Sequence, residues 1–178
     1  MPFAVSRSDP LSWSGTGRGL SLADCAKSCM TPRQPPPKST GRERFGERFL
    51  QRVLGQAESD AASCYDVLAS LTEFTAQSIA LNYQLHLPSL PKEIILCGGG
   101  EANPFLVQRL QMAIASLSDK VRIRSCKEWG WPRECIEPAA FALLAHARLM
   151  GRPGNIPSTT GARRASQLGQ ITEPPENI

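Results

Sequence analysis

Residues 93–104 read EIILCGGGEANP, and this segment bears most directly on chemistry. Residues 94–97 are apolar and rich in β-branched side chains, which predicts a short buried strand. Because glycine lacks a Cβ, the backbone after this strand can adopt positive φ and lie against a ligand at Gly98, Gly99 and Gly100. Asn103 is a favourable N-cap, and Pro104 suits the first helical position. Strand, glycine turn and helix N-terminus together predict a binding site for a nucleotide or another anion.

A tight turn between a strand and a helix that binds nothing would show the same pattern. The glycines do not have the G-x-G-x-x-G spacing of dinucleotide folds, and no Lys-Ser/Thr pair follows them as in a Walker loop. From the residues of this segment alone, both interpretations stay open.

Hydrophobic periodicity predicts the order helix, strand, helix, strand, helix. The expected segments are helices at 66–83, 104–116 and 134–150 and strands at 94–97 and 120–125, preceded by a short, mixed segment at 44–56 whose apolar residues have helical spacing. Asp66 is the expected N-cap of the helix at 66–83, and Cys97 is expected to be a small core residue. In the helix at 104–116 the apolar residues are expected to face inward, and Arg109 is not. Alternating strands and helices indicate an α/β fold with parallel strands. Two strands are too few for a stable sheet, so the domain is expected to be incomplete.

The chain has 178 residues, six cysteines and a net charge of +4. Residues 1–33, rich in Pro, Ser and Gly, predict an irregular leader, and 174–178 a tail. The charge is modest and the basic residues are not clustered, so we expect no nucleic-acid partner. No apolar run predicts a membrane span or a signal peptide. The cysteines form no C-x-x-C pair, and the two histidines lie far from any cysteine cluster, which predicts free thiols in a reducing cytoplasm and no metal site.

Five segments resemble one known family in the family's own order. They cover residues 34–171 and read PPPKSTGRERF, LTEFTAQSIALNY, ILCGGGEANP, EPAAFALLA and GRPGNIPSTTGARRASQLG. The chain resembles the C-terminal part of anhydro-N-acetylmuramic acid kinase, a family of the sugar kinase, Hsp70 and actin superfamily. The resemblance implies that residues 34–173 form part of an RNase H-like C-terminal lobe. It also implies an ATP-dependent kinase that uses Mg²⁺ and water to open a 1,6-anhydro amino sugar and phosphorylate its O6.

Carried over residue by residue, the resemblance assigns nucleotide contacts to Gly98, Gly99, Gly100 and Asn103. It assigns a sugar contact to Glu137, although Pro138 follows here where alanine is usual in the family. Without the family, Glu137 would be interpreted as a first-turn carboxylate favoured by the helix dipole. The segment KSTGRE at 38–43 matches a strong family signature whose physical role does not follow from its residues.

The resemblance also implies that the phosphate-binding loop and the catalytic aspartate lie in segments that this chain lacks. None of the aspartates stands in a catalytic motif; they are Asp9, Asp24, Asp60, Asp66 and Asp119. Two function classes therefore stay open. One is a kinase, or one part of a split kinase completed by a separate N-terminal fragment; a homodimer is the alternative expected assembly. The other is a truncated, non-catalytic remnant that binds nucleotide or packs against a partner.

Overall fold

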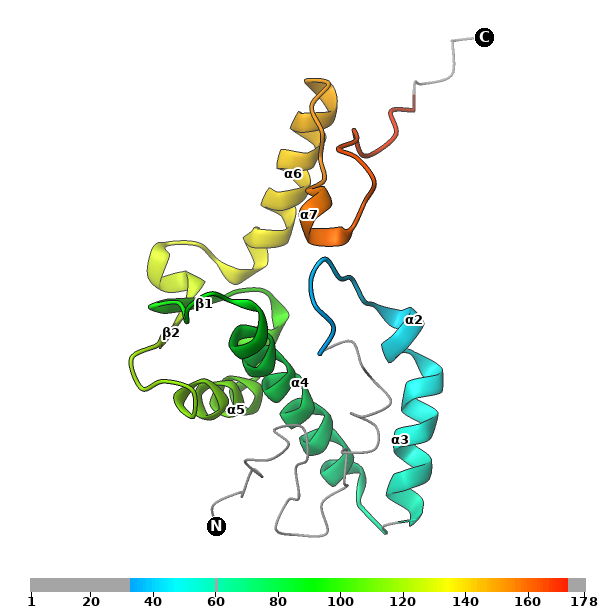
Figure 1. Cartoon of the computed structure of the whole chain (residues 1–178), viewed down its shortest axis with the longest axis vertical. Helices are drawn as coiled ribbons and strands as arrows, with labels where there is room; N and C mark the ends of the chain where they lie inside the picture. Colours follow the sequence, from blue (N-terminus) through cyan, green and yellow to red (C-terminus); the bar gives the residue numbers. More distant parts are fainter. Residues whose placement is uncertain (1–32, 60, 173–178) are drawn as a thin grey trace.

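The computed structural model describes residues 33–59 and 61–172 (Figure 1). The expected leader, apart from Arg33, and the expected tail lie outside these residues. The helices are α2 (Arg42–Phe45), α3 (Glu47–Ser59), α4 (Cys64–His86), α5 (Pro104–Ala115), α6 (Ile136–Leu149) and α7 (Pro157–Thr160), and the strands are β1 (Glu93–Leu96) and β2 (Arg122–Ser125). Three 3-10 turns, η1 (Gly99–Ala102), η2 (Cys126–Trp129) and η3 (Arg133–Cys135), follow β1, β2 and η2 respectively.

The two strands pair in parallel, as the alternation of strands and helices predicts. Ile94 lies opposite Ile123, and Leu96 opposite Ser125. Helix α5 makes the connection between them and packs against α4, so α4, β1 and α5 share one hydrophobic core. Its buried members are Ala76, Ala80, Ile94, Leu110, Ala113 and Ile114. Within the described residues the sheet has these two strands only, so the predicted α/β class is confirmed for a small sheet.

A second, smaller core joins α3 to the first half of α4. Phe49, Val53 and Ala57 of α3 are buried there against Val67. Gly46 lies between α2 and α3, and the position requires glycine because a Cβ there would lie 2.2 Å from the carbonyl oxygen of Arg42. The mixed segment expected at 44–56 thus belongs to two helices that meet at a glycine, where the chain turns.

Three predictions about single residues were wrong. Ser63, not Asp66, is the N-cap of α4, and Asp66 completes the capping box from the N3 position. Cys97 is exposed because the strand ends one residue earlier, at Leu96. Arg109 is buried, since its guanidinium pairs with Glu73 of α4.

Helix α6 and the segment after it extend away from the sheet (Figure 1). The expected apolar side of α6 is not a core, because no residue of this helix is buried. The segment after Gly151 is held by hydrogen bonds within itself: Gly154 N donates to Ser166 O at 3.0 Å, and Ser166 N donates to Asn155 Oδ1 at 2.7 Å. Arg148 of α6 donates to Gln167, so this segment contacts the end of α6 but leaves most of the helix exposed.

Candidate functional site

The glycine turn lies at the carboxyl end of β1, where parallel sheets commonly bind ligands. Gly98 has φ +75° and ψ −168°, a conformation that favours glycine. Gly99 and Gly100 do not have positive φ, since they begin the 3-10 turn η1. Asn103 caps α5 as predicted: its Oδ1 accepts the backbone N–H groups of Phe105 at 3.1 Å and Leu106 at 3.2 Å.

The backbone of the turn faces open space. Among the described residues, a Cβ at Gly98 or Gly99 would meet no atom within 4 Å, and one at Gly100 would touch a methyl group of Leu106 at 3.5 Å. The described part of the chain thus leaves the position of a side chain at Gly98 and Gly99 unfilled. Packing within the described residues therefore does not require glycine at position 99. Close approach of a ligand to the backbone is a physical reason for glycine there.

Glu101, which sequence reasoning missed, ties the turn to the end of β2. Its carboxylate accepts hydrogen bonds from the Ser125 hydroxyl and, at 3.3 Å, from the Cys126 thiol. The Ser125 hydrogen bond, helped by nearby Lys127 and Arg133, holds the pKa of Glu101 below its ordinary value despite partial burial. The sequence signal that could have pointed to Glu101 is its position as an acidic residue directly after the three glycines.

A basic group stands beside this network on β2. Arg124 pairs with Glu93 at 3.1 Å and with Glu128 at 2.8 Å, and its guanidinium lies 5.7 Å from the centre of the Trp129 ring. The hydrogen bond from Arg124 lowers the pKa of Glu128. These pairs fix the end of β2 and the η2 turn next to Glu101.

Glu137 lies in the first turn of α6 and is exposed. In the part of the chain that the structure describes, its carboxylate has no hydrogen-bond or ion-pair partner. The turn η3, just before α6, contacts η1, so the start of α6 lies near the glycine turn. Pro138 occurs within the first helical turn, where the missing N–H disturbs no helical hydrogen bond.

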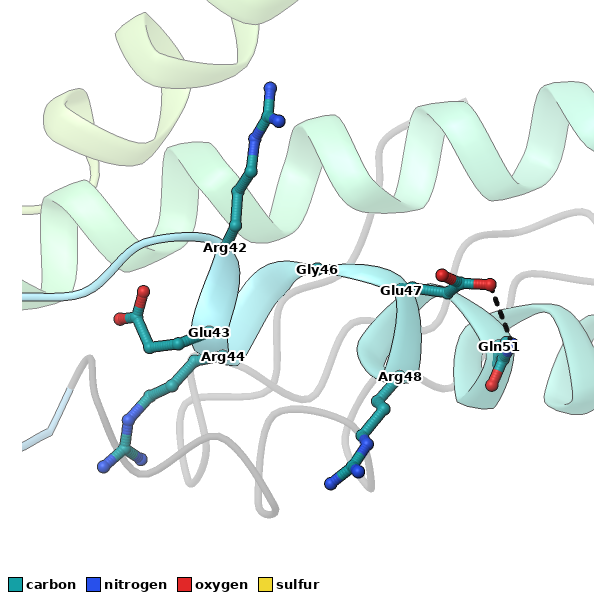
Figure 2. A pocket seen from close by; sticks show the side chains of 7 residues that line it. All are labelled: Arg42, Glu43, Arg44, Gly46, Glu47, Arg48 and Gln51. Atoms are coloured by element: carbon teal, nitrogen blue, oxygen red, sulfur yellow. Dashed lines mark hydrogen bonds between the residues drawn. The ribbon is translucent and has the colours of Figure 1, made fainter.

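Two concavities are lined by residues outside the glycine turn. Figure 2 shows a polar one of about 490 Å³ along α2 and α3, where Arg44 and Arg48 point to one side and Arg42 to the other. The second, here called the apolar groove, has about 810 Å³ and runs from the 38–40 segment past α3 and α4 to β1. Its apolar lining comes from Phe45, Phe49, Leu71, Phe74, Ile79, Tyr83, Ile94, Ile95, Leu96 and Leu110.

Lys38 of the family signature lies at the apolar groove. Its ammonium donates to the carbonyl of Gln34 at 2.9 Å, and partial burial lowers its pKa.

Among the residues described, no helix is long and apolar enough to span a membrane. Likewise, no three His, Cys, Asp or Glu side chains within 33–59 and 61–172 come together as a metal site would require.

The model of the family described as anhydro-N-acetylmuramic acid kinase matches residues 30–174. The chain belongs to this family. A relative named anhydro-N-acetylmuramic acid kinase from Cyanothece sp. (strain PCC 7425 / ATCC 29141) is 49% identical over 138 residues, which cover 78% of this chain and 35% of the relative. One of the same name from Synechococcus sp. (strain ATCC 27144 / PCC 6301 / SAUG 1402/1) is 41% identical over 170 residues, which cover 94% of this chain and 43% of the relative. The chain thus spans less than half the length of these relatives.

Proposed function

We propose that this chain forms the nucleotide-contacting, C-terminal part of an ATP-dependent kinase of 1,6-anhydro-N-acetylmuramic acid. Family membership supports the reaction class, and the glycine turn is the observation that carries the assignment of the site. In the proposed reaction, water opens the anhydro ring and the γ-phosphoryl group of ATP passes to O6, giving N-acetylmuramic acid 6-phosphate and ADP. Such a reaction belongs to cell-wall recycling and amino sugar catabolism in the cytoplasm.

In this proposal the lobe is RNase H-like, and the backbone of Gly98, Gly99 and Gly100 lies against the adenosine side of the nucleotide. Asn103 caps α5 through its side-chain oxygen, so its side-chain N–H₂ group takes no part in the cap. When the nucleotide is bound, Mg²⁺ would supply neutralisation of the phosphate charge. Glu137, exposed and near the turn, is the proposed hydrogen-bond acceptor for the sugar.

The site assignment is tested by substituting valine at Gly99. Since a Cβ there meets no atom of the described residues within 4 Å, we expect Gly99→Val to leave the fold intact but to place a branched side chain where the backbone would meet the ligand. We expect at least a tenfold weaker binding of Mg²⁺–ADP, measured by isothermal titration on a kinase rebuilt by adding the N-terminal part of the Cyanothece relative. The matched control is Gly55→Val, which also meets nothing within 4 Å but lies on α3. Equal affinity in Gly99→Val and the parent would show that the turn is only structural.

A second candidate function is nucleotide binding without catalysis. The specific observation is the state of the two aspartates within the described residues: Asp66 is bound in the capping box of α4, and Asp119 lies in an exposed surface turn. Neither is placed to activate water at the glycine turn, and catalysis requires a base held beside the substrate.

We therefore expect the 178-residue polypeptide by itself to leave 1,6-anhydro-N-acetylmuramic acid unphosphorylated. The measurement is mass-spectrometric detection of the 6-phosphosugar after incubation with ATP and Mg²⁺. The rebuilt kinase is the positive control. Product above the no-protein blank from the chain alone would contradict this expectation.

A further inference from the structure

Two cysteines meet at the candidate site. Leu96 of β1 lies opposite Ser125 of β2, so Cys97 and Cys126 directly follow the last paired residues of two adjacent parallel strands. Neighbouring strands lie roughly 4.8 Å apart. That spacing falls within the range of about 4.4–6.8 Å between Cα atoms that a disulfide requires. We propose that Cys97 and Cys126 form an oxidisable thiol pair, a modification site at the base of the glycine turn.

The two thiols differ in access. Cys97 is exposed, whereas 3% of Cys126 is exposed and its thiol donates to Glu101. Burial and the Glu101 carboxylate raise the pKa of Cys126, and the charge of a Cys97 thiolate raises it further, which agrees with their proximity. Cys97 is thus the thiol that an oxidant reaches first, and Cys126 is the resolving thiol.

The chemistry balances with hydrogen peroxide as the oxidant. The Cys97 thiolate attacks one peroxide oxygen, forms a sulfenic acid and releases water after proton transfer. The Cys126 thiolate then attacks the Cys97 sulfur, an S–S bond forms, and the sulfenic oxygen leaves as a second water. Overall, two thiols lose two electrons and two protons, and one peroxide becomes two waters.

This reaction acts directly on the glycine turn. Once oxidised, Cys126 no longer donates its S–H to Glu101. This carboxylate thereby loses one of the two hydrogen bonds that tie η1 to Ser125 of β2 and to Cys126 of η2. The S–S bond would also restrain Cys97, which directly precedes Gly98 with its φ of +75°. Oxidation therefore changes the turn that the proposed function uses, but formation of the S–S bond needs no nucleotide.

Tryptic mapping tests the pair, because cleavage after Lys and Arg places each of the six cysteines on its own peptide. The full chain is treated with hydrogen peroxide and digested without reductant. We expect peptide 93–109 linked to peptide 125–127, and loss of this species on reduction. Absence of the linked species, terminal oxidation of Cys97 instead, or a dominant link from 93–109 to 134–148, which carries Cys135, would overturn the proposal.

Variants separate the pair from general oxidation. Cys97→Ser is at an exposed position and should remove the link, whereas the matched control Cys64→Ser, also exposed, should leave it unchanged. Hydrogen exchange of residues 98–103 gives the second readout. We expect a severalfold change in exchange rate when the parent is oxidised and none in Cys97→Ser. Unchanged exchange in an oxidised parent would overturn the coupling to the turn. Because neither readout uses ligand or activity, failure here is distinguishable from failure of the proposed kinase.

Discussion

Glu73 and Arg109 face each other across the interface of α4 and α5, with 1% and 5% of their surfaces exposed. Gln77 also donates to Glu73 at 2.7 Å, so this carboxylate is held by two partners. Truncation of Arg109 to alanine leaves a buried, uncompensated charge. We therefore expect Arg109→Ala to lower the free energy of unfolding by about 3–5 kcal/mol, measured by urea denaturation.

The control for this residue-scale prediction is Arg122→Ala, since Arg122 is an exposed arginine on β2. Its loss should cost well under 1 kcal/mol. The double variant Glu73→Leu/Arg109→Met should recover most of the stability, because apolar side chains of similar size avoid the desolvation of both charges. Equal unfolding energies for Arg109→Ala and Arg122→Ala would refute the structural role of the pair.

At the scale of elements, the start of α4 is set by a reciprocal cap. Ser63 Oγ accepts from Asp66 N at 3.2 Å, and Asp66 Oδ2 accepts from Ser63 N at 2.9 Å. Ser63→Ala should therefore cost about 0.5–2 kcal/mol of stability. The hydrogen bonds from Ser63 also lower the pKa of Asp66 from its ordinary value of 3.8.

The sign of the resulting pH dependence follows from linkage. Since the pKa of Asp66 is lower in the folded than in the unfolded chain, its contribution is fully present above pH 3.8. It is lost as the pH falls through the folded-state pKa. Urea midpoints measured between pH 5 and pH 2.5 should therefore drop less steeply in Asp66→Asn than in the parent. Parallel curves would contradict the prediction.

The elements differ in how far the sequence could predict them. Helix α5 was predictable because its cap, first-turn proline and apolar side are all local signals at 103–117. The pairing of Arg109 was not, since its partner Glu73 lies 36 positions earlier in the chain. Cys97 was misplaced because four apolar residues in a row do not show where a strand ends. Glu101 was overlooked, since its contacts with Ser125 and Cys126 form only when β1 and β2 pair.

At the scale of the whole molecule, large apolar surfaces remain uncovered. Ile95 of β1, which lines the apolar groove, is 47% exposed, and Phe141 and Leu143 of α6 are 64% and 70% exposed. Apolar patches of this kind in a folded chain mark interaction surfaces. The two-stranded sheet points the same way, because a sheet normally needs three or more strands for independent stability. We therefore expect these surfaces of the described residues to pack against further polypeptide.

The final prediction concerns how the isolated chain behaves in solution. The uncovered surface at β1 should drive association, so we expect species larger than the 19.4 kDa monomer at micromolar concentration in analytical ultracentrifugation. Ile95→Lys places a charge on this strand and should shift the sample toward monomer. The matched control is Leu50→Lys on α3, since Leu50 is 44% exposed but lies outside the groove lining. It should leave the distribution unchanged. A parent chain that is monomeric with one sharp thermal transition would show that this fold is stable alone and that the groove needs no partner.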